Sequence, residues 1–281
     1  MEVKIRTLTP LWTGDINRKG KIPRESGIIG SLRWWYEVLV RGLGGYACDP
    51  TDTNSCRLPV SSDKDEKTIN VSKLCPACQL FGCSGWSRKF ILRLSTDQDK
   101  GDKHNGIPID TEISIMFTEL KKITETELYL LNKTLEIIEK YGALGGKITK
   151  GYGVIEILKQ DILCAKPIKL DLGRKKNNEN NYYDLSKFLS YEYVVKRGKR
   201  SDRNDQKIFD VNKKIIFSQP YMVHDENETQ RFRVFGFPKQ NENFYNCHNH
   251  IKMSLGKNII NYYQKTGNGI IKEIYQDMEV S

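Results

Sequence analysis

The stretch from Gly27 to Gly45 constrains the fold most, because its apolar residues recur at the spacing of an amphipathic helix. They follow one another at offsets of one, three and four residues, which places them on one stripe that packs on a core. Ser26 is the predicted N-cap, and glycines follow the last apolar position. The stripe consists of Ile28, Ile29, Leu32, Trp35, Tyr36, Leu39, Val40 and Leu43.

The start of this helix has the composition of an anion site. Gly27 and Gly30 weaken its first turn, and such residues are tolerated where something approaches the backbone N–H groups. A helix N-terminus favours anions, and phosphate is the usual one. Arg33, Trp34 and Arg41 lie off the apolar stripe, where two guanidinium groups beside an aromatic ring suit a stacked base near its phosphates. The alternative is that Trp34 packs under a neighbouring loop.

The first half of the chain predicts a ferredoxin-like domain. Residues 3–8 alternate in polarity, and further strands are expected at 90–94, 112–118 and 154–157. Thr124 and Glu127 form a predicted capping box that opens a second helix, which extends to about Tyr141. The resulting order, strand–helix–strand–strand–helix–strand, is also that of RNA-recognition modules. The domain is expected to span residues 1–158, with an insertion at 46–86.

The second half has a weaker pattern. Helices are expected at 182–195 and 253–264, and strands at 215–217 and 231–237. These elements fit a degenerate second copy of the same unit, over residues 159–281. The sequence therefore predicts an α+β protein with tandem ferredoxin-like domains, the first clear and the second degenerate.

Charge favours an anionic partner. The net charge of the 281 residues is +10, and the isoelectric point is about 9.1. Nucleic acid is the leading candidate, ahead of an acidic protein surface or a contribution to solubility alone. Arg18 and Lys21 belong to a basic loop that leads into the first helix. A glycine-rich loop at 145–153 also suits a phosphate backbone, although it could be an ordinary turn. Its candidate RNA contacts are Gly146, Lys147, Lys150 and Tyr152.

That glycine-rich loop is neither of the common nucleotide-binding motifs. It lacks the spacing of a P-loop, and it follows a helix, whereas P-loops and dinucleotide-binding loops follow a strand. The loop therefore predicts contact with a phosphate backbone and gives no indication of a bound nucleotide cofactor.

The seven cysteines favour reduced thiols in a cytoplasmic protein. Their number is odd, and the first residues lack the apolar segment of a signal peptide. Cys75, Cys78 and Cys83, with Cys56 upstream, could supply four thiolates to one structural zinc ion. Cys48 competes with Cys56 for the fourth position, and buried reduced thiols are the alternative. No apolar run approaches the roughly 20 residues of a membrane span.

The sequence predicts no catalytic residues. The four histidines lack the spacing of a zinc protease and lie in poorly patterned regions. Asp15 and Asp97 occupy polar loops near the basic region, but neither has an identifiable partner base or nucleophile. The expected protein is therefore not an enzyme.

Three segments together resemble a known family. They are Thr9-Pro-Leu-Trp-Thr-Gly14, then Ser26 to Glu37 with Gly42-Leu-Gly-Gly45, then Cys75-Pro-Ala-Cys-Gln-Leu-Phe-Gly82. They are similar to the RAMP superfamily of CRISPR proteins, and most closely to the first subunit of the type III-B Cmr effector complex. The loop at 145–153 is similar to the superfamily's glycine-rich loop. Cys83 departs from the family pattern, as does the short, Asn- and Lys-rich second half.

The resemblance implies a non-catalytic subunit at one end of a ribonucleoprotein, in which a different subunit cuts the target. Such a subunit binds guide and target RNA near the 3′ end of the guide, and its partners are those RNAs and the other Cmr subunits. The alternatives are a RAMP endoribonuclease that processes CRISPR RNA, and a basic protein-interaction scaffold. The RNA contacts implied by position are Arg18, Lys21, Arg33, Trp34, Arg41, Lys147, Lys150 and Tyr152.

Overall fold

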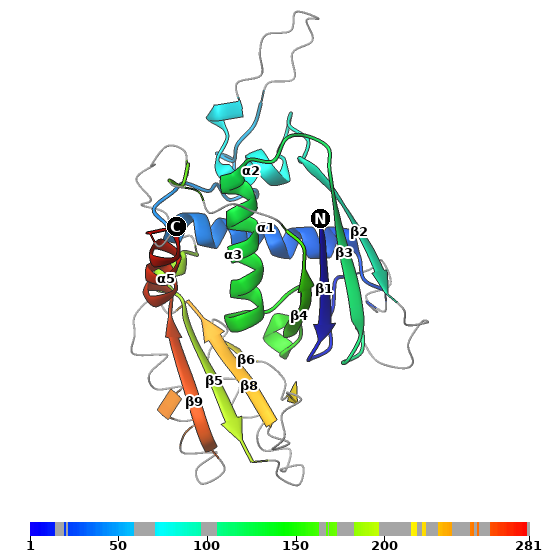
Figure 1. Ribbon diagram of the computed structural model, residues 1–281, viewed down its shortest axis with the longest axis vertical. Helices are drawn as coiled ribbons and strands as arrows, with labels where there is room; N and C mark the ends of the chain where they lie inside the picture. The colour runs from blue at the N-terminus through cyan, green and yellow to red at the C-terminus, as the bar shows by residue number, and fades with distance from the viewer. Residues whose placement is uncertain are drawn as a thin grey trace, which may run out of the picture.

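Two antiparallel sheets and the helices packed on them make up the molecule (Figure 1). The computed structural model describes residues 1–14, 20, 22–58, 71–96, 106–162, 167, 169–172, 183–196, 215–217, 221–222, 230–237, 248–249, 252 and 259–279. No helix in these ranges is both long enough and apolar enough to cross a bilayer.

The first sheet has ferredoxin-like topology. Its strands are β1 (Glu2–Thr7), β2 (Phe90–Thr96), β3 (Glu112–Glu119) and β4 (Ile155–Gln160), in the order β2-β3-β1-β4. Helix α1 (Glu25–Gly42) connects β1 to β2, and α3 (Glu125–Tyr141) connects β3 to β4. All pairs are antiparallel, and Ile5 lies opposite both Ile113 and Ile157. The predicted fold class is confirmed, and these six elements begin and end within about two residues of most predicted bounds.

On the open face of this sheet, ion pairs connect β1 to the neighbouring strands β3 and β4. Strand β1 buries Val3, Ile5 and Thr7 and turns its alternate residues outward. Lys4 pairs with Glu112 at 2.6 Å, and Arg6 approaches both Glu112 and Glu156 at 3.4 Å. The two aromatic residues in the four strands, Phe90 and Phe117, are buried. RNA-recognition modules stack bases on aromatic side chains of this face, and this sheet offers none there.

The two helix starts differ in how they are capped. At α3 the predicted capping box is confirmed: Glu127 N–H donates to Thr124 Oγ1 at 3.2 Å, and Thr124 N–H donates to Glu127 Oε2 at 2.8 Å. At α1 the predicted cap Ser26 is wrong, because the helix begins at Glu25 and Arg24 is its N-cap residue. Thr13 Oγ1 from a distant segment accepts the Arg24 N–H at 2.8 Å.

In its described residues, 46–58 and 71–86, the insertion after α1 contains the short helices η1 (Val71–Lys73) and α2 (Pro76–Phe81). Helix α2 packs against α1, and the ring centroids of Tyr36 and Phe81 are 5.4 Å apart. A third short helix, η2 (Ile148–Lys150), lies in the glycine-rich loop. Through the contact of α2 with α1, the insertion extends the hydrophobic core of the first sheet.

The second half forms its own sheet. The sheet consists of β5 (Leu189–Val195), β6 (Ile215–Phe217), β7 (Tyr221–Met222), β8 (Gln230–Gly236) and β9 (Ile259–Thr266). The short helix η3 (Leu185–Lys187) precedes β5, and helix α5 (Gly267–Glu279) follows β9. The order β6-β8-β5-β9, with β7 beside β8, repeats the order of the first sheet. The predicted strands at 215–217 and 231–237 are confirmed. The predicted helices at 182–195 and 253–264 are wrong, because β5 and β9 occupy the C-terminal half of each range.

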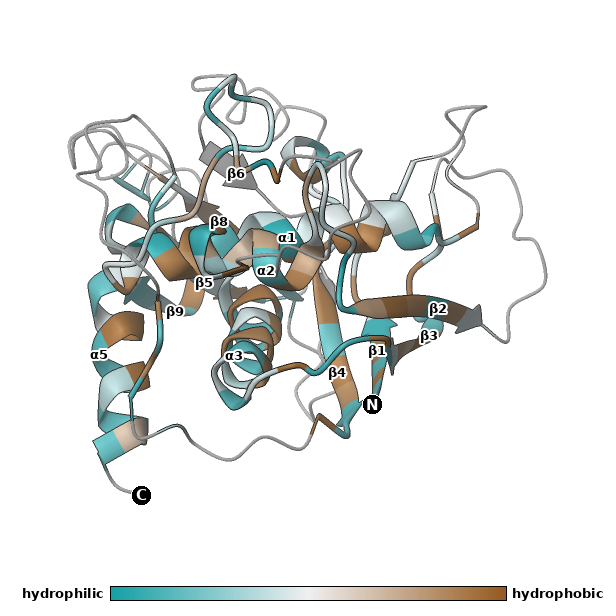
Figure 2. Cartoon of the chain, turned by 90° about the horizontal axis from the view of Figure 1, so that it is seen from above, coloured by the Kyte–Doolittle hydropathy of each residue, from teal (hydrophilic) through white to brown (hydrophobic). Residues whose placement is uncertain are grey.

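One hydrophobic cluster contains residues of both sheets, and the second sheet has a smaller cluster of its own. Trp35 of α1 packs on Phe188 and Phe235, with ring centroids 5.7 and 6.1 Å away. A Cβ at Gly142 would lie 2.4 Å from the Trp35 ring, so only glycine permits this contact. Ile270 and Ile274 of α5 join the same cluster, and Figure 2 shows apolar and polar bands along that helix. The division of the chain at residues 158 and 159 stays a prediction.

Candidate nucleic-acid interface and metal centre

The start of α1 and the glycine-rich loop meet at the segment Leu11–Thr13. The Gly146 N–H donates to the Trp12 carbonyl at 2.7 Å, and Thr13 accepts the N–H of Arg24 at the start of α1. Ser31 of α1 accepts the Gly145 N–H directly, at 2.9 Å. The two regions predicted to grip RNA therefore lie on the same side of the molecule.

Close packing of the chain on itself explains several of the glycines there. A Cβ at Gly27 would lie 2.1 Å from the Thr13 carbonyl oxygen. One at Gly146 would lie 2.8 Å from the Trp12 ring, and one at Gly20 would lie 2.2 Å from it. The sequence interpretation attributed Gly27 and Gly146 to an approaching phosphate, whereas the structure fills both positions with the segment Leu11–Thr13. Gly30 differs, because it is exposed and a Cβ there would meet nothing within 4 Å.

The two lysines of the glycine-rich loop differ in burial: Lys150 is exposed and Lys147 is half-buried. Lys147 has a left-handed backbone with φ of 54°, and its Nζ lies 4.5 Å from the centroid of the Trp12 ring. Lys150 is exposed, Tyr152 is half-buried, and η2 lies against β6 at the junction of the two sheets. This arrangement presents positive charge beside an aromatic ring. The predicted contacts Arg18 and Lys21 lie outside the described residues.

The two arginines of α1 point inward. Arg33 donates to the Glu37 carboxylate and the Gly82 carbonyl, both at 2.8 Å, and to Cys78 Sγ at 3.3 Å. Arg41 has a side chain that is only 5% exposed, and it donates to the carbonyls of Ala47, Cys48 and Tyr183 at 2.9, 3.1 and 3.0 Å. Protein acceptors thus occupy the donors of both guanidinium groups, so the geometry does not support the predicted contact of Arg33 and Arg41 with RNA.

Glu37 lies between these arginines. Its Oε1 accepts from Arg33, and its Oε2 is 3.7 Å from Arg41 Nη2. Burial raises the pKa of Glu37 to about 7, against the opposing effect of the two guanidinium groups. Because burying a lone carboxylate is costly, the two arginines are what make the ionised form tolerable.

Trp34 follows the alternative in the sequence interpretation and packs under a neighbouring segment. It is half-buried, and its ring centroid lies 4.9 Å from Trp35, 5.6 Å from Tyr183 and 5.7 Å from Phe237. The last two residues belong to the second half of the chain. Trp34 therefore helps to join the two halves.

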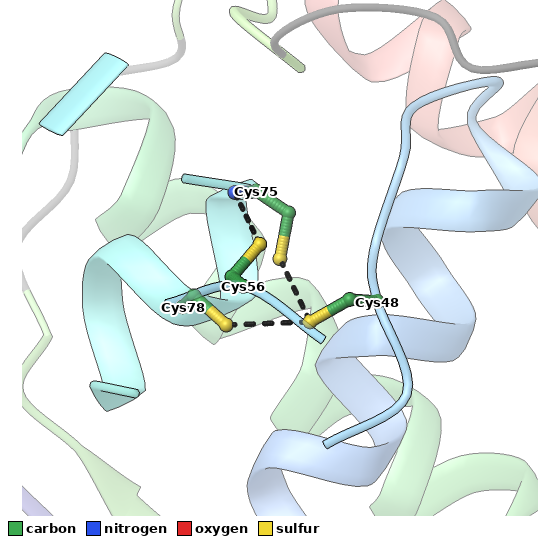
Figure 3. Close-up of side chains that lie close together, drawn as sticks. All are labelled: Cys48, Cys56, Cys75 and Cys78. Atoms are coloured by element: carbon green, nitrogen blue, oxygen red, sulfur yellow. Dashed lines mark hydrogen bonds between the residues drawn. The ribbon is translucent and has the colours of Figure 1, made fainter. Parts of the chain in front are cut away.

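Four cysteine side chains converge beside α1 (Figure 3). The Sγ atoms of Cys48, Cys56, Cys75 and Cys78 all lie within 4.8 Å of one another. The Cys48 sulfur is 3.4 Å from that of Cys78 and 3.7 Å from that of Cys75. Three of the four predicted ligands are thus brought together, and the fourth position belongs to Cys48.

Cys83 lies outside this group, which corrects the predicted ligand set. Gly82 ends α2 with φ of 87°, a backbone conformation that favours glycine, and the Cys83 thiol that follows interacts with Cys78 without joining the four converging sulfur atoms. Cys83 then pairs its backbone with Trp86, and its Sγ contacts the Ser84 carbonyl at 3.7 Å. The local Cys-x4-Cys spacing gave no sign of this turn.

The geometry of the four thiols fits a tetrahedral metal ion. Zinc–thiolate bonds of about 2.3 Å place the sulfur atoms about 3.8 Å apart, close to the separations observed. Hydrogen bonds from the Cys48, Cys75 and Cys78 thiols lower the pKa of Cys56, and its Sγ also accepts the Cys75 N–H at 3.4 Å. Four protein ligands would leave no open position for a substrate or water.

Among the groups considered for catalysis, Asp15, Asp97, His104, His224 and His250 lie outside the described residues. His248 is buried, and its Nδ1 lies 2.7 Å from the Tyr193 hydroxyl. Burial lowers the pKa of His248. The ring stacks on Tyr191 with centroids 4.4 Å apart, so this histidine serves the packing of the second sheet.

Comparison with known proteins gives two kinds of match. The sequence model of the RAMP superfamily matches residues 4–156. Among solved structures, the crystal structure of apo Cmr1 from Pyrococcus furiosus is similar with a TM-score of 0.51 and 11% identity, covering 85% of this chain and 88% of that chain. A chain of a Type IV-B CRISPR complex gives a TM-score of 0.40 and 15% identity, covering 59% of this chain and 93% of that chain. The second similarity is too distant to support an argument about the fold.

A search of curated protein sequences found no significant match. The superfamily match covers more than half of the 281 residues: it begins within β1, contains β2 and β3, and ends within β4. The structural similarity extends the likeness in fold to most of the second half. The chain therefore belongs to the RAMP superfamily.

Proposed function

We propose that this protein is a non-catalytic RNA-binding subunit of a CRISPR effector complex of the type III-B (Cmr) kind. Membership of the RAMP superfamily and the similarity in fold to Cmr1 support the proposal. In this proposal the subunit contacts guide and target RNA near the 3′ end of the guide, and its other partners are the remaining subunits of the complex.

One observation supports RNA contact more than any other: the start of α1 and the loop at 145–153 converge at Trp12, beside one half-buried and one exposed lysine. Lys147 lies over the Trp12 ring, and Lys150 is exposed on the short helix that follows it. Lysine side chains at a protein surface neutralise backbone phosphates without reading the sequence. The open face of the first sheet, with its ion pairs and lack of aromatic residues, is not part of the proposed interface.

We also propose a structural zinc ion as the cofactor, held by Cys48, Cys56, Cys75 and Cys78. The separations between the four sulfur atoms support it. The ion would fix the insertion after α1 onto that helix. With four thiolate ligands it would take no part in RNA cleavage.

Salt-dependent RNA binding tests the proposed interface. The double variant Lys147→Gln/Lys150→Gln should bind single-stranded RNA about tenfold more weakly than the wild type. Its salt slope should fall by roughly 1 for each phosphate that a lysine no longer neutralises. The melting temperature should change little. The measurement is filter binding at a series of salt concentrations.

Lys140→Gln/Lys159→Gln is the matched control, because it removes the same charge from two lysine side chains that are both 55% exposed elsewhere on the surface. Equal reductions of affinity in the two double variants would show a general charge effect and contradict the interface. Metal-independent cleavage of a CRISPR repeat RNA by the wild-type chain would contradict the non-catalytic assignment and favour a processing endoribonuclease.

A further inference from the structure

Helix α1 turns a row of charged side chains toward the four cysteines. Arg33, Glu37 and Arg41 are spaced four residues apart, which places them on one face of the helix. We propose that Arg33 and Arg41 are positioning residues of the metal centre: Arg33 acts on the Cys78 thiolate, and Arg41 holds the backbone that presents Cys48. This inference rests on the zinc site proposed above.

Charge is the first reason. One Zn²⁺ with four thiolates has a net charge of about −2, and most of this centre is buried. The Arg33 Nη2 lies 3.3 Å from Cys78 Sγ, and the side chain is only 17% exposed. A guanidinium at this distance offsets the excess negative charge and donates a charge-assisted hydrogen bond to the sulfur.

The orientation of Arg33 is fixed independently of the sulfur. Its Nε donates to Glu37 and its Nη1 donates to the Gly82 carbonyl, both at 2.8 Å. Gly82 ends α2, the helix that contains Cys78. Because two donors of this planar group have acceptors other than the sulfur, the guanidinium is held in place before a metal arrives, with its third donor directed at Cys78 Sγ.

Arg41 acts on the cluster through the backbone. Its guanidinium donates to the carbonyls of Ala47 and Cys48, and so holds the segment that presents the fourth sulfur. The same group donates to the Tyr183 carbonyl from the second half of the chain. One buried side chain thus connects α1, the metal centre and the segment that leads into the second sheet.

Cobalt substitution tests the assignment, because Co²⁺ in a tetrahedral thiolate site absorbs through sulfur-to-metal charge transfer. The reduced, metal-free chain would be titrated with Co²⁺, and the Co²⁺ displaced with Zn²⁺. We expect Arg33→Gln to weaken metal binding by 10- to 100-fold. In the fully loaded protein it should also shift the charge-transfer band to lower energy, because the sulfur loses its hydrogen-bond donor.

Three further variants make the test specific. Arg33→Lys keeps the charge and should restore part of the affinity and of the band position. Arg41→Lys should weaken metal binding without shifting the band, because Arg41 contacts carbonyl oxygens rather than sulfur. Arg93→Gln is the control, since Arg93 is exposed on β2, and it should match the wild type in both readouts.

Two outcomes distinguish a failure of the proposed metal centre from a failure of the role proposed for Arg33. A wild-type chain that gives no tetrahedral Co²⁺–thiolate spectrum would overturn the metal centre and this inference with it. A wild-type chain that binds Co²⁺, with an Arg33→Gln variant of equal affinity and unshifted band, would overturn the role of Arg33 alone. The band position is measured in the loaded, folded protein, so it distinguishes an effect on the sulfur from a general loss of stability.

Discussion

Two pairs of cations that the sequence predicted to bind RNA have different surroundings in the structure. Arg33 and Arg41 of α1 donate to carbonyl oxygens, a carboxylate and a sulfur inside the protein. Lys147 and Lys150 of the glycine-rich loop are more accessible: Lys147 is half-buried over the Trp12 ring, and Lys150 is exposed. The comparison shows that a positive charge near a predicted binding site is informative only once the acceptors around it are known.

The chemistry of the two side chains matches this division. Arginine presents five donors in a rigid plane, so it can hold several carbonyl oxygens at once in a buried position. Lysine places a strongly hydrated charge on a flexible stem, which suits contact with a mobile, solvated phosphate. The buried pair is therefore expected to affect stability and metal binding, and the surface pair to affect RNA affinity.

The largest effect is expected at the proposed metal centre, next to the buried arginines. Cys48→Ser should abolish high-affinity zinc binding, because it removes one of the four converging sulfur atoms. Cys83→Ser should keep it. The measurement is zinc content after dialysis, together with the change in melting temperature on adding a chelator. A Cys83→Ser variant that loses zinc while Cys48→Ser keeps it would restore the ligand set inferred from sequence spacing.

Arg41→Ala should lower the free energy of unfolding by about 3 kcal/mol, because it leaves three carbonyls without their donor and Glu37 with a single buried partner. Lys150→Ala should change it by less than about 0.5 kcal/mol, as is usual for an exposed side chain. Urea unfolding of both variants gives the two values. If the two changes are similar, the division into a buried and a surface pair does not hold.

Smaller effects than that of Arg41→Ala are expected at two glycines of α1. Gly27→Ala should lower the stability by about 2 kcal/mol, because the new Cβ would meet the Thr13 carbonyl. Gly30→Ala should raise it by about 0.5–1 kcal/mol, because the position is open and alanine favours a helix. Thermal unfolding measures both. If Gly30→Ala is stable but binds RNA more weakly, the proposed interface extends onto the first turns of α1.

The first sheet could be predicted because its signals are local. Residues 3–8 alternate in polarity, and Thr124 and Glu127 cap α3 across three residues. In the second half the same kind of inference failed at β5 and β9. Tyr191 and Tyr193 alternate with Ser190 and Glu192 at strand spacing, but the neighbouring apolar residues also fit a helix. The pairing of β5 between β8 and β9 decides the conformation, and pairing between distant strands cannot be inferred from one short segment.

The sequence by itself determined the ferredoxin-like first half, the excess of positive charge and the Cys-x2-Cys half of the proposed metal centre. Tertiary structure decided which cysteine completes that centre, and it turned Arg33 and Arg41 inward. It also placed Trp12 against Gly146. The physical reason is that helix periods, caps and net charge depend on neighbours within a few residues. The partner of a thiol, a guanidinium or a glycine is set by segments brought together only when the core forms.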